Sequence, residues 1–186
     1  STITATQATT TNYLAGTTTA LFTVINVIPT ITGFSPITKT FGDASFNLVT
    51  PTSNSTGAFT YTSSNTAVAT VSGSRITIVS AGTSTITATQ SLTANYVSGT
   101  ITTTLTVNKA TPVLSNFSEI TKTFGNAAFS LVAPTSNSTG AFTYTSSNTA
   151  VATVTNNMIT IVGGGSSTIT AVQIATPNYL TATITA

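Results

Sequence analysis

The chain contains no cysteine, histidine or tryptophan, and its only acidic residues are Asp43 and Glu119. The absence of cysteine excludes disulfides, thiol nucleophiles and thiolate metal sites. Without histidine, a serine or threonine hydroxyl lacks its conventional base, and acid–base catalysis needs two titratable groups that converge on one site. Calcium usually needs several carboxylates in one cluster. The sequence therefore predicts no enzyme, no cofactor and no metal site.

Charge of either sign is scarce, since four cationic and two acidic side chains give a net charge of +2. Four scattered cations make no basic stripe, which argues against a nucleic-acid partner. There is no run of about 18 apolar residues, so this segment is not expected to insert into a membrane. The hydrophobic fraction is nevertheless 40%, with nine phenylalanines, which is too apolar for a disordered chain. The composition predicts a folded protein whose exposed faces carry hydroxyl groups.

A long repeat organises the chain. The segment Pro51–Val71 recurs letter for letter as Pro134–Val154, an offset of 83 residues, and the same offset relates residues 84–90 to residues 1–7. A fixed period indicates that each copy is one folding unit, here with the length of a small domain. We predict three units: residues 1–27 as the C-terminal strands of a preceding repeat, 28–110 as a complete repeat, and 111–186 as a repeat that lacks the end of its last strand.

Short alternating segments fill each unit, and none has a helical period. In the last strand of the complete unit, Ile101, Thr103, Leu105 and Val107 are expected to face the core, with threonines outward. Turn residues recur every 8–12 residues, which is typical of an antiparallel β-sandwich. The expected strands are Thr30–Phe34, Ile37–Thr40, Phe46–Val49, Ala58–Ser63, Ala67–Val71, Arg75–Val79, Ser84–Gln90 and Ile101–Val107, with Pro51–Gly57 as a loop.

The aromatic residues also follow the period. Every phenylalanine except Phe22, which aligns with Leu105, has an equivalent phenylalanine in the other long unit. Aromatics that recur in each unit are more often architectural than part of a binding site, so we expect the phenylalanines to form the core between the sheets. The tyrosines that follow Asn12, Asn95 and Asn178 are expected to close one end of that core.

Three further features are interpreted structurally. Asp43 aligns with Asn126, which predicts a turn residue in which the two side chains are interchangeable. Lys39 and Lys122, equivalent positions beside the same turn, are expected to be solvated. The junction Asn108–Pro112 is short and has no Gly/Ser run, so it is expected to restrict the relative orientation of its neighbours.

The string FTYTSSNTAVATVSGSRITIVSAGTSTITATQ, followed by Asn95-Tyr96 and a closing TLTV strand, resembles bacterial immunoglobulin-like domains, with the group 2, invasin/intimin-like repeats as the nearest type. The resemblance covers both long units and extends into the N-terminal fragment. It implies tandem Ig-like antiparallel β-sandwich repeats. Such repeats serve as stalks and surface-display modules in bacterial adhesins, and they occur in phage and large-virus structural proteins. The family implies no catalytic residues.

The leading hypothesis is a non-catalytic structural module of a larger tandem-repeat protein: a stalk, a fibre, or a component of a surface coat or virion decoration. Its expected location is extracellular, at a cell or virion surface, and its expected partners are neighbouring repeats, copies of itself or another structural protein. The alternative is an adhesin segment that binds a host receptor or glycan. A non-repeated cluster of exposed aromatics would favour the adhesin, because sites arise in one unit whereas architecture recurs in all.

Candidate modification sites are Asn54, Asn116 and Asn137, each of which begins an Asn-x-Ser/Thr triplet that matches the N-glycosylation acceptor pattern. Chance matches are expected in a chain this rich in asparagine, serine and threonine. Both interpretations stay open.

The candidate contact face comprises Leu21 and Ile25. These residues lie opposite Phe22 and Val24, so the strand is apolar on both faces, whereas their counterparts Thr104 and Asn108 are polar. We predict that Leu21 and Ile25 pack against another subunit or layer. Because two strands alone lack a sheet to join, residues 1–27 are expected to pair with preceding chain or with a neighbouring molecule.

Overall fold

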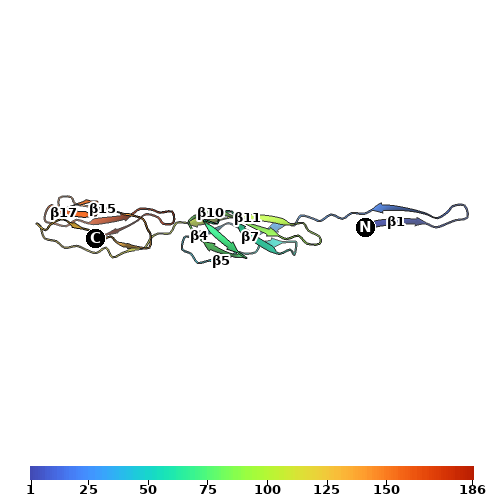
Figure 1. Ribbon diagram of the computed structural model, residues 1–186, viewed down its shortest axis with the longest axis horizontal. Coiled ribbons are helices and arrows are strands. Elements are labelled where there is room, and N and C mark those ends of the chain that lie inside the picture. Colours follow the sequence, from blue (N-terminus) through green and yellow to red (C-terminus); the bar gives the residue numbers. More distant parts are fainter.

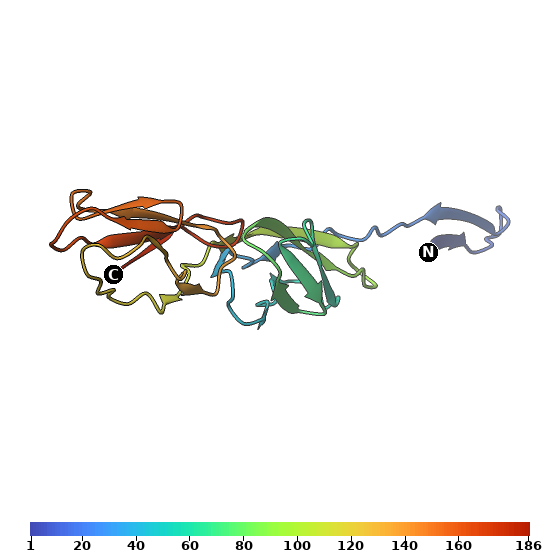
Figure 2. The same cartoon turned by 60° about the vertical axis from the view of Figure 1, so that its left-hand side comes forward.

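The computed structural model describes residues 1–186, and all of its regular elements are β-strands (Figure 1). A hairpin stands at one end of an elongated molecule, and two groups of sheets follow it along the long axis (Figures 1 and 2). The all-β sandwich expected from the alternating segments is confirmed. The structure contains no helix that could cross a membrane.

The N-terminal hairpin consists of β1 (Thr2–Gln7) and β2 (Gly16–Leu21), which pair antiparallel and join no other strand. Every residue of the two strands is exposed. The alternation that buries one face of a strand elsewhere in the chain therefore has nothing to pack against here.

The strands of the middle sandwich lie between Ile31 and Asn108. One sheet has the order β4-β11-β10-β7 and faces a second sheet of order β5-β9-β8, while a two-stranded sheet pairs β3 with β6. The strands are β3 (Ile31–Thr32), β4 (Ile37–Thr40), β5 (Phe46–Asn47), β6 (Thr52–Ser53), β7 (Phe59–Ser63), β8 (Ala69–Ser72), β9 (Arg75–Ile78), β10 (Gly82–Gln90) and β11 (Gly99–Asn108).

The C-terminal sandwich repeats this arrangement with fewer strands. Its sheets have the orders β15-β18-β19, β13-β17-β16 and β12-β14, and no strand corresponds to β4. The strands are β12 (Leu114–Ser115), β13 (Phe129–Ser130), β14 (Thr135–Ser136), β15 (Phe142–Ser146), β16 (Ala152–Thr155), β17 (Met158–Ile161), β18 (Ile169–Gln173) and β19 (Ala182–Thr185).

Alternation along β10 and β11 supplies the middle core, as the sequence predicts. Ile86, Ala88 and Leu105 are fully buried, and Val107 is 3% exposed. The outward threonines on β11 keep the other face polar. Seven buried residues form this core, against three in the C-terminal sandwich: Leu48, Val68, Ala69, Ile76, Ile86, Leu105 and Val107, compared with Leu131, Ile159 and Ile169.

Three departures from the expected strands concern the edges of the middle sandwich. The pairing of β4 with β11 is parallel, so the sandwich is not wholly antiparallel. The segment Pro51–Gly57 is not only a loop, because it contains β6. The expected strand Thr30–Phe34 shrinks to Ile31–Thr32, since the next residue, Gly33, has a φ of 77° that breaks the extended backbone.

A buried amide explains why the segment 51–57 is ordered. Gln90 Nε2 donates to the carbonyl oxygens of Ser55 and Gly57 at 2.9 Å each, and its Oε1 accepts from Ser53 Oγ at 2.7 Å. Gln173 makes the same three contacts in the C-terminal sandwich, to Ser136, Ser138 and Gly140. One side chain in each unit thus satisfies the polar groups of a loop that no sheet pairs fully.

The phenylalanine expectation is only partly correct. Phe34 and Phe46 pack against the middle core, and Phe117 and Phe129 against the C-terminal one. Phe124 is 68% exposed, however, so it contributes to no core. Phe124 is exposed because it lies in a turn at the end of the C-terminal sandwich that faces away from the middle sandwich.

The polar turn residues behave as the alignment predicts. Asp43 Oδ2 accepts a hydrogen bond from the backbone of Thr40 at 2.9 Å, and Asn126 Oδ1 accepts the equivalent bond from Thr123 at the same distance. Lys39 and Lys122 differ from the expectation of simple solvation, because each ammonium lies over a phenylalanine ring, at 4.8 and 5.0 Å from the centroids of Phe46 and Phe129.

Candidate functional site: the Asn-Tyr joint and its open counterpart

The recurring Asn-Tyr pairs sit on loops of the same geometry. In each of the three loops a backbone N–H donates to the tyrosine carbonyl three residues on, at 2.8 to 3.0 Å: Thr10 to Tyr13, Thr93 to Tyr96 and Thr176 to Tyr179. This turn closes the loop and fixes where the asparagine and tyrosine side chains project.

The loop of each long unit also fastens the chain that enters that unit. The backbone of Ala110 forms a parallel bridge with Tyr179: its N–H donates to the Asn178 carbonyl at 2.9 Å, and its carbonyl accepts from Leu180 at 2.8 Å. Val27 bridges Tyr96 in the same way. The residue that links one unit to the next is therefore held by a single parallel β-bridge.

The side chains of this loop reach across to the preceding sandwich. The Tyr179 ring meets Phe41 edge to face, with centroids 5.5 Å apart and an interplanar angle of 79°. Asn178 Oδ1 accepts a hydrogen bond from the Ala81 N–H at 2.9 Å, and Lys109 Nζ donates to the Thr176 carbonyl at 2.7 Å. We call these contacts, together with the Ala110 bridge, the Asn-Tyr joint.

The expectation that these tyrosines close their own core is wrong for Tyr179. Its ring packs on the neighbouring unit because the loop lies at the end of the C-terminal sandwich that faces the middle sandwich. Phe41, its partner, stands in the turn before β5 and is packed against the edge of the middle core. The sequence signal was present in the recurrence of Phe41-Gly42 and Asn178-Tyr179, but nothing local tells which unit a ring will contact.

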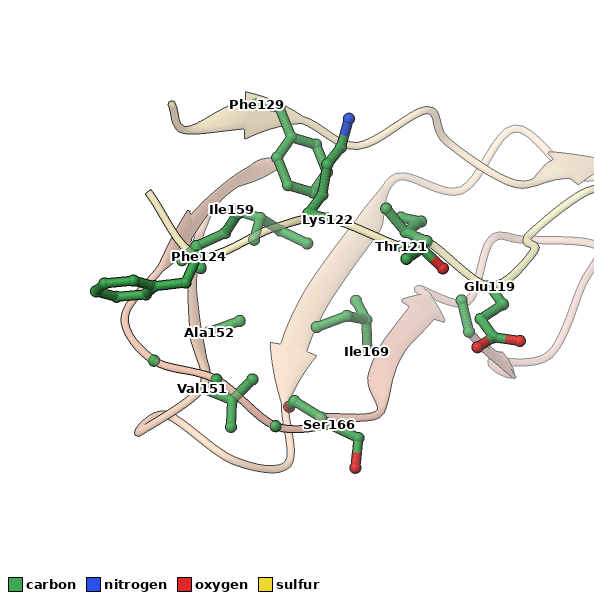
Figure 3. Close-up of a pocket in the computed structure, with 17 residues that line it drawn as sticks. Glu119, Thr121, Lys122, Phe124, Phe129, Val151, Ala152, Ile159, Ser166 and Ile169 are labelled. Atoms are coloured by element: carbon green, nitrogen blue, oxygen red, sulfur yellow. The ribbon is translucent and has the colours of Figure 1, made fainter. Parts of the chain in front are cut away.

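The far end of the C-terminal sandwich presents the same surface without a partner. Phe124 is the repeat equivalent of Phe41, and it is 68% exposed, whereas Phe41 is half-buried beneath Tyr179. Figure 3 shows the Phe124 ring directed outward at the edge of a cavity. The surface that Tyr179 covers on the middle sandwich is therefore uncovered at the equivalent place on the C-terminal sandwich.

That cavity, of about 330 Å³, opens between the two sheets of the C-terminal sandwich (Figure 3). We call it the open groove. Nine of its 17 lining residues are hydrophobic, among them Ile120, Phe129, Ala152, Ile159 and Ile169, and Glu119 and Lys122 are its only charged side chains. The equivalent space in the middle sandwich is occupied by the end of β11, where Leu105 is fully buried and Val107 nearly so.

The two backbone segments that flank the open groove belong to no strand. In the middle sandwich, residues 105–108 pair with β4 on one side, and residues 105–107 pair with the beginning of β10 on the other. The counterparts of β4 and of the beginning of β10 in the C-terminal sandwich, residues 120–123 and 165–167, belong to no strand. The open groove is therefore the place of one strand segment, bounded by two edges that a strand would join.

The candidate glycosylation residues are all exposed. The Oδ1 atoms of Asn54 and Asn137 accept hydrogen bonds at 2.9 Å from the backbone N–H groups of Thr30 and Val113, and Asn116 Nδ2 donates to Thr135 Oγ1 at 2.9 Å. These contacts give each asparagine a structural role in its loop. Glycosylation stays a prediction.

The candidate contact face lies on the N-terminal segment, apart from the joint and the open groove. Leu21 is 80% exposed and Ile25 81% exposed, and their neighbours Phe22 and Val24 are 57% and 77% exposed. The chain therefore presents four large apolar side chains within five residues to solvent, where it passes from the hairpin to the middle sandwich (Figure 1). Their packing against another subunit stays a prediction.

No protein-family model matches the chain, and no curated protein matches its sequence. Similar solved structures include Drosophila N-cadherin EC1-4, at 9% identity and a TM-score of 0.30, with 99% of this chain and 57% of that chain covered. Another is BT4661, a SusE-like surface located polysaccharide binding protein from Bacteroides thetaiotaomicron, at 14% identity and a TM-score of 0.31, with 98% and 36% covered. These scores carry no argument about function.

Proposed function

We propose that the chain is a non-catalytic structural module of a larger tandem-repeat protein, in which successive immunoglobulin-like units are fastened end to end by the Asn-Tyr joint. The observation that carries the proposal is that Asn178 and Tyr179, which recur in the other units, contact the preceding sandwich rather than their own core. In a spacer, stalk or fibre built from repeats, we expect the residues that join neighbouring units to recur in every unit.

The surface chemistry supports the same assignment. The outward faces of β10 and β11 carry threonines, and the only charged side chains at the open groove are Glu119 and Lys122. General acid–base catalysis needs a convergent titratable pair, and Glu119 has no acidic counterpart in the middle unit, where Pro36 stands at the equivalent position. Our proposal assigns no catalytic role to the chain.

The finer assignment follows the sequence resemblance. We place the units with the group 2, invasin/intimin-like bacterial immunoglobulin-like repeats, in an extracellular stalk, coat or virion-decoration component. Its partners are then neighbouring repeats and other copies of a structural protein. A host receptor or glycan would be the partner of the alternative, an adhesin segment.

Small-angle scattering of the full chain at dilute concentration tests the proposal. If the joint holds the sandwiches end to end, the pair-distance distribution shows a resolved second maximum from the fixed spacing of the two sandwiches. A matched variant with Gly-Ser-Gly-Ser inserted after Lys109 keeps both sandwiches but separates Ala110 from its upstream neighbour, and its second maximum should broaden. Identical curves for the two chains would contradict the proposal. Saturable binding of a glycan, lost on a substitution in a single unit, would favour the adhesin.

A further inference from the structure

We propose that the outer face of β10 and β11 is an ice-binding surface, which recognises the ordered water of an ice lattice. Every second residue from Thr83 to Thr89 and from Thr100 to Thr106 is a threonine on this face. We call these residues the threonine face. The inference goes beyond the proposed function, because the joint could link units in a chain that never meets ice.

The register of the two strands arranges the threonine face as a regular array. Antiparallel pairing places its members directly opposite one another, from the pair Thr83–Thr106 to the pair Thr89–Thr100. Neighbouring strands lie about 4.8 Å apart, and residues two positions apart along a strand are separated by about 6.8 Å. These two repeats are close to the repeats of water oxygens on a prism face of ice. Lattice water can therefore stay in register with the threonine face in both directions.

Threonine side chains have the chemistry that such water requires. The branch at Cβ restricts the χ1 angle, so each hydroxyl and each methyl group is held in place before water binds. All members of the threonine face are exposed or half-buried, which leaves their hydroxyls open to solvent. The array thus presents rows of fixed hydroxyl groups, with methyl groups between them.

The same face carries neither a charge nor an aromatic ring, since β10 and β11 contain none. On the neighbouring strand β4, the ammonium of Lys39 lies over the ring of Phe46, which belongs to the opposite sheet. Soluble surfaces commonly carry about 25–35% charged side chains of both signs, so solubility alone does not explain an uncharged array. Crystalline polysaccharide is a weaker match, because the face offers no ring on which a sugar could stack.

The twist of the sheet limits how far the array extends. Adjacent strands are rotated by about 20–25°, so a face that spans many strands is not flat. Thr60 and Thr62 of β7 continue two rows of the array, opposite Thr89 and Thr87, but they lie on a strand that is turned away from β11. We therefore assign the site to the β10–β11 pair.

Similar threonine pairs occur in the other units. Thr4 lies opposite Thr19 in the N-terminal hairpin, and Thr170 lies opposite Thr185 in the C-terminal sandwich. Several weak sites on one chain bind an extended surface more tightly than a single site does. A repeat protein is therefore an effective support for a surface whose individual contacts are weak.

Slow growth of ice from a dilute solution of the full chain tests the proposal. Growing ice excludes ordinary solutes, whereas a protein that binds ice is incorporated. The double substitution Thr85→Lys and Thr102→Lys places two strongly hydrated ammonium groups at diagonal positions of the array, and it should lower the amount of chain in the ice about fivefold or more. Thr77→Lys with Thr160→Lys is the matched control. It adds the same charge at exposed positions of β9 and β17 and should leave incorporation unchanged.

The shape of the ice crystals separates recognition of the lattice from passive trapping. Ice grown in the presence of the unmodified chain should develop flat prism facets, whereas ice grown with the Thr85→Lys and Thr102→Lys variant should stay rounded. Both variants should unfold at the same denaturant concentration as the unmodified chain, because all four substitutions are on outward faces.

Three results would overturn the proposal. The unmodified chain could be excluded from ice, which decides the matter without any variant. The variant of the threonine face could be incorporated as well as the unmodified chain. Sedimentation velocity could instead show that the unmodified chain self-associates through the threonine face and is excluded from ice, which would identify a second copy as the occupant. The scattering test of the joint is independent of all three results.

Discussion

The orientation of the two sandwiches should depend on two side chains, Asn178 and Tyr179. Replacing both with alanine removes the edge-to-face contact with Phe41 and the hydrogen bond from Ala81, but it keeps the backbone bridge at Ala110. An aromatic pair contributes about 0.5–1.5 kcal/mol beyond its area, and a hydrogen bond contributes a similar net amount. The sum of about 1–3 kcal/mol corresponds to a decrease of about 5- to 150-fold in the ratio of docked to undocked sandwiches.

The absence of cysteine makes the measurement direct. Ser72→Cys in the middle sandwich and Thr155→Cys in the C-terminal one are exposed sites for a pair of spin labels. At monomeric concentration, the distance distribution between the labels should be narrow in the otherwise unmodified chain and broad in the double alanine variant. Tyr13→Ala is the matched control, because Tyr13 lies on an equivalent loop and is 72% exposed. A distribution that stays narrow without Asn178 and Tyr179 would refute the reasoning.

Three further predictions concern stability, the first two measured by denaturant unfolding and the third by a pH titration. Gln90→Met leaves two buried carbonyls without their donor and should cost about 2–6 kcal/mol, whereas its exposed equivalent, Gln7→Met, should cost almost nothing. Leu105→Ala in the middle core should cost about 2–5 kcal/mol. Burial raises the pKa of the Tyr144 phenol above its ordinary value near 10. The neutral phenol therefore contributes to the free energy of unfolding at pH values below about 10, and this contribution is lost as the pH rises through the raised pKa. Phenolate absorbance during a pH titration, compared with that of a Tyr144→Phe variant, should show the raised pKa.

The alternation of apolar and hydroxyl residues was enough to predict the core strands. Along β10 and β11 a period of two determines which residues are buried, and the burial of Ile86, Leu105 and Val107 follows from it. The turn at Asp43 was predictable for a similar reason, since its alignment with Asn126 leaves only a short acceptor side chain in common. These features depend on local pattern alone.

The joint could not be predicted in the same way. Tyr179 and Phe124 belong to the same class of recurring aromatics, yet one is covered by the preceding unit and the other is exposed. Their environments depend on which neighbour lies beyond the end of a sandwich, and a single period contains no information about that. The role of Gln90 was missed for a related reason, because a polar residue at the end of a strand pattern is ordinarily expected to be solvated.

The parallel pairing of β4 with β11 has a mechanical consequence. These strands lie near the entry and the exit of the middle unit, and four residue pairs, from Leu105–Ile37 to Asn108–Thr40, hold them side by side. Stretching the chain from its ends would slide the two strands past one another, so the backbone bonds between them would bear load together instead of opening one at a time. We expect this unit to resist pulling strongly for its size.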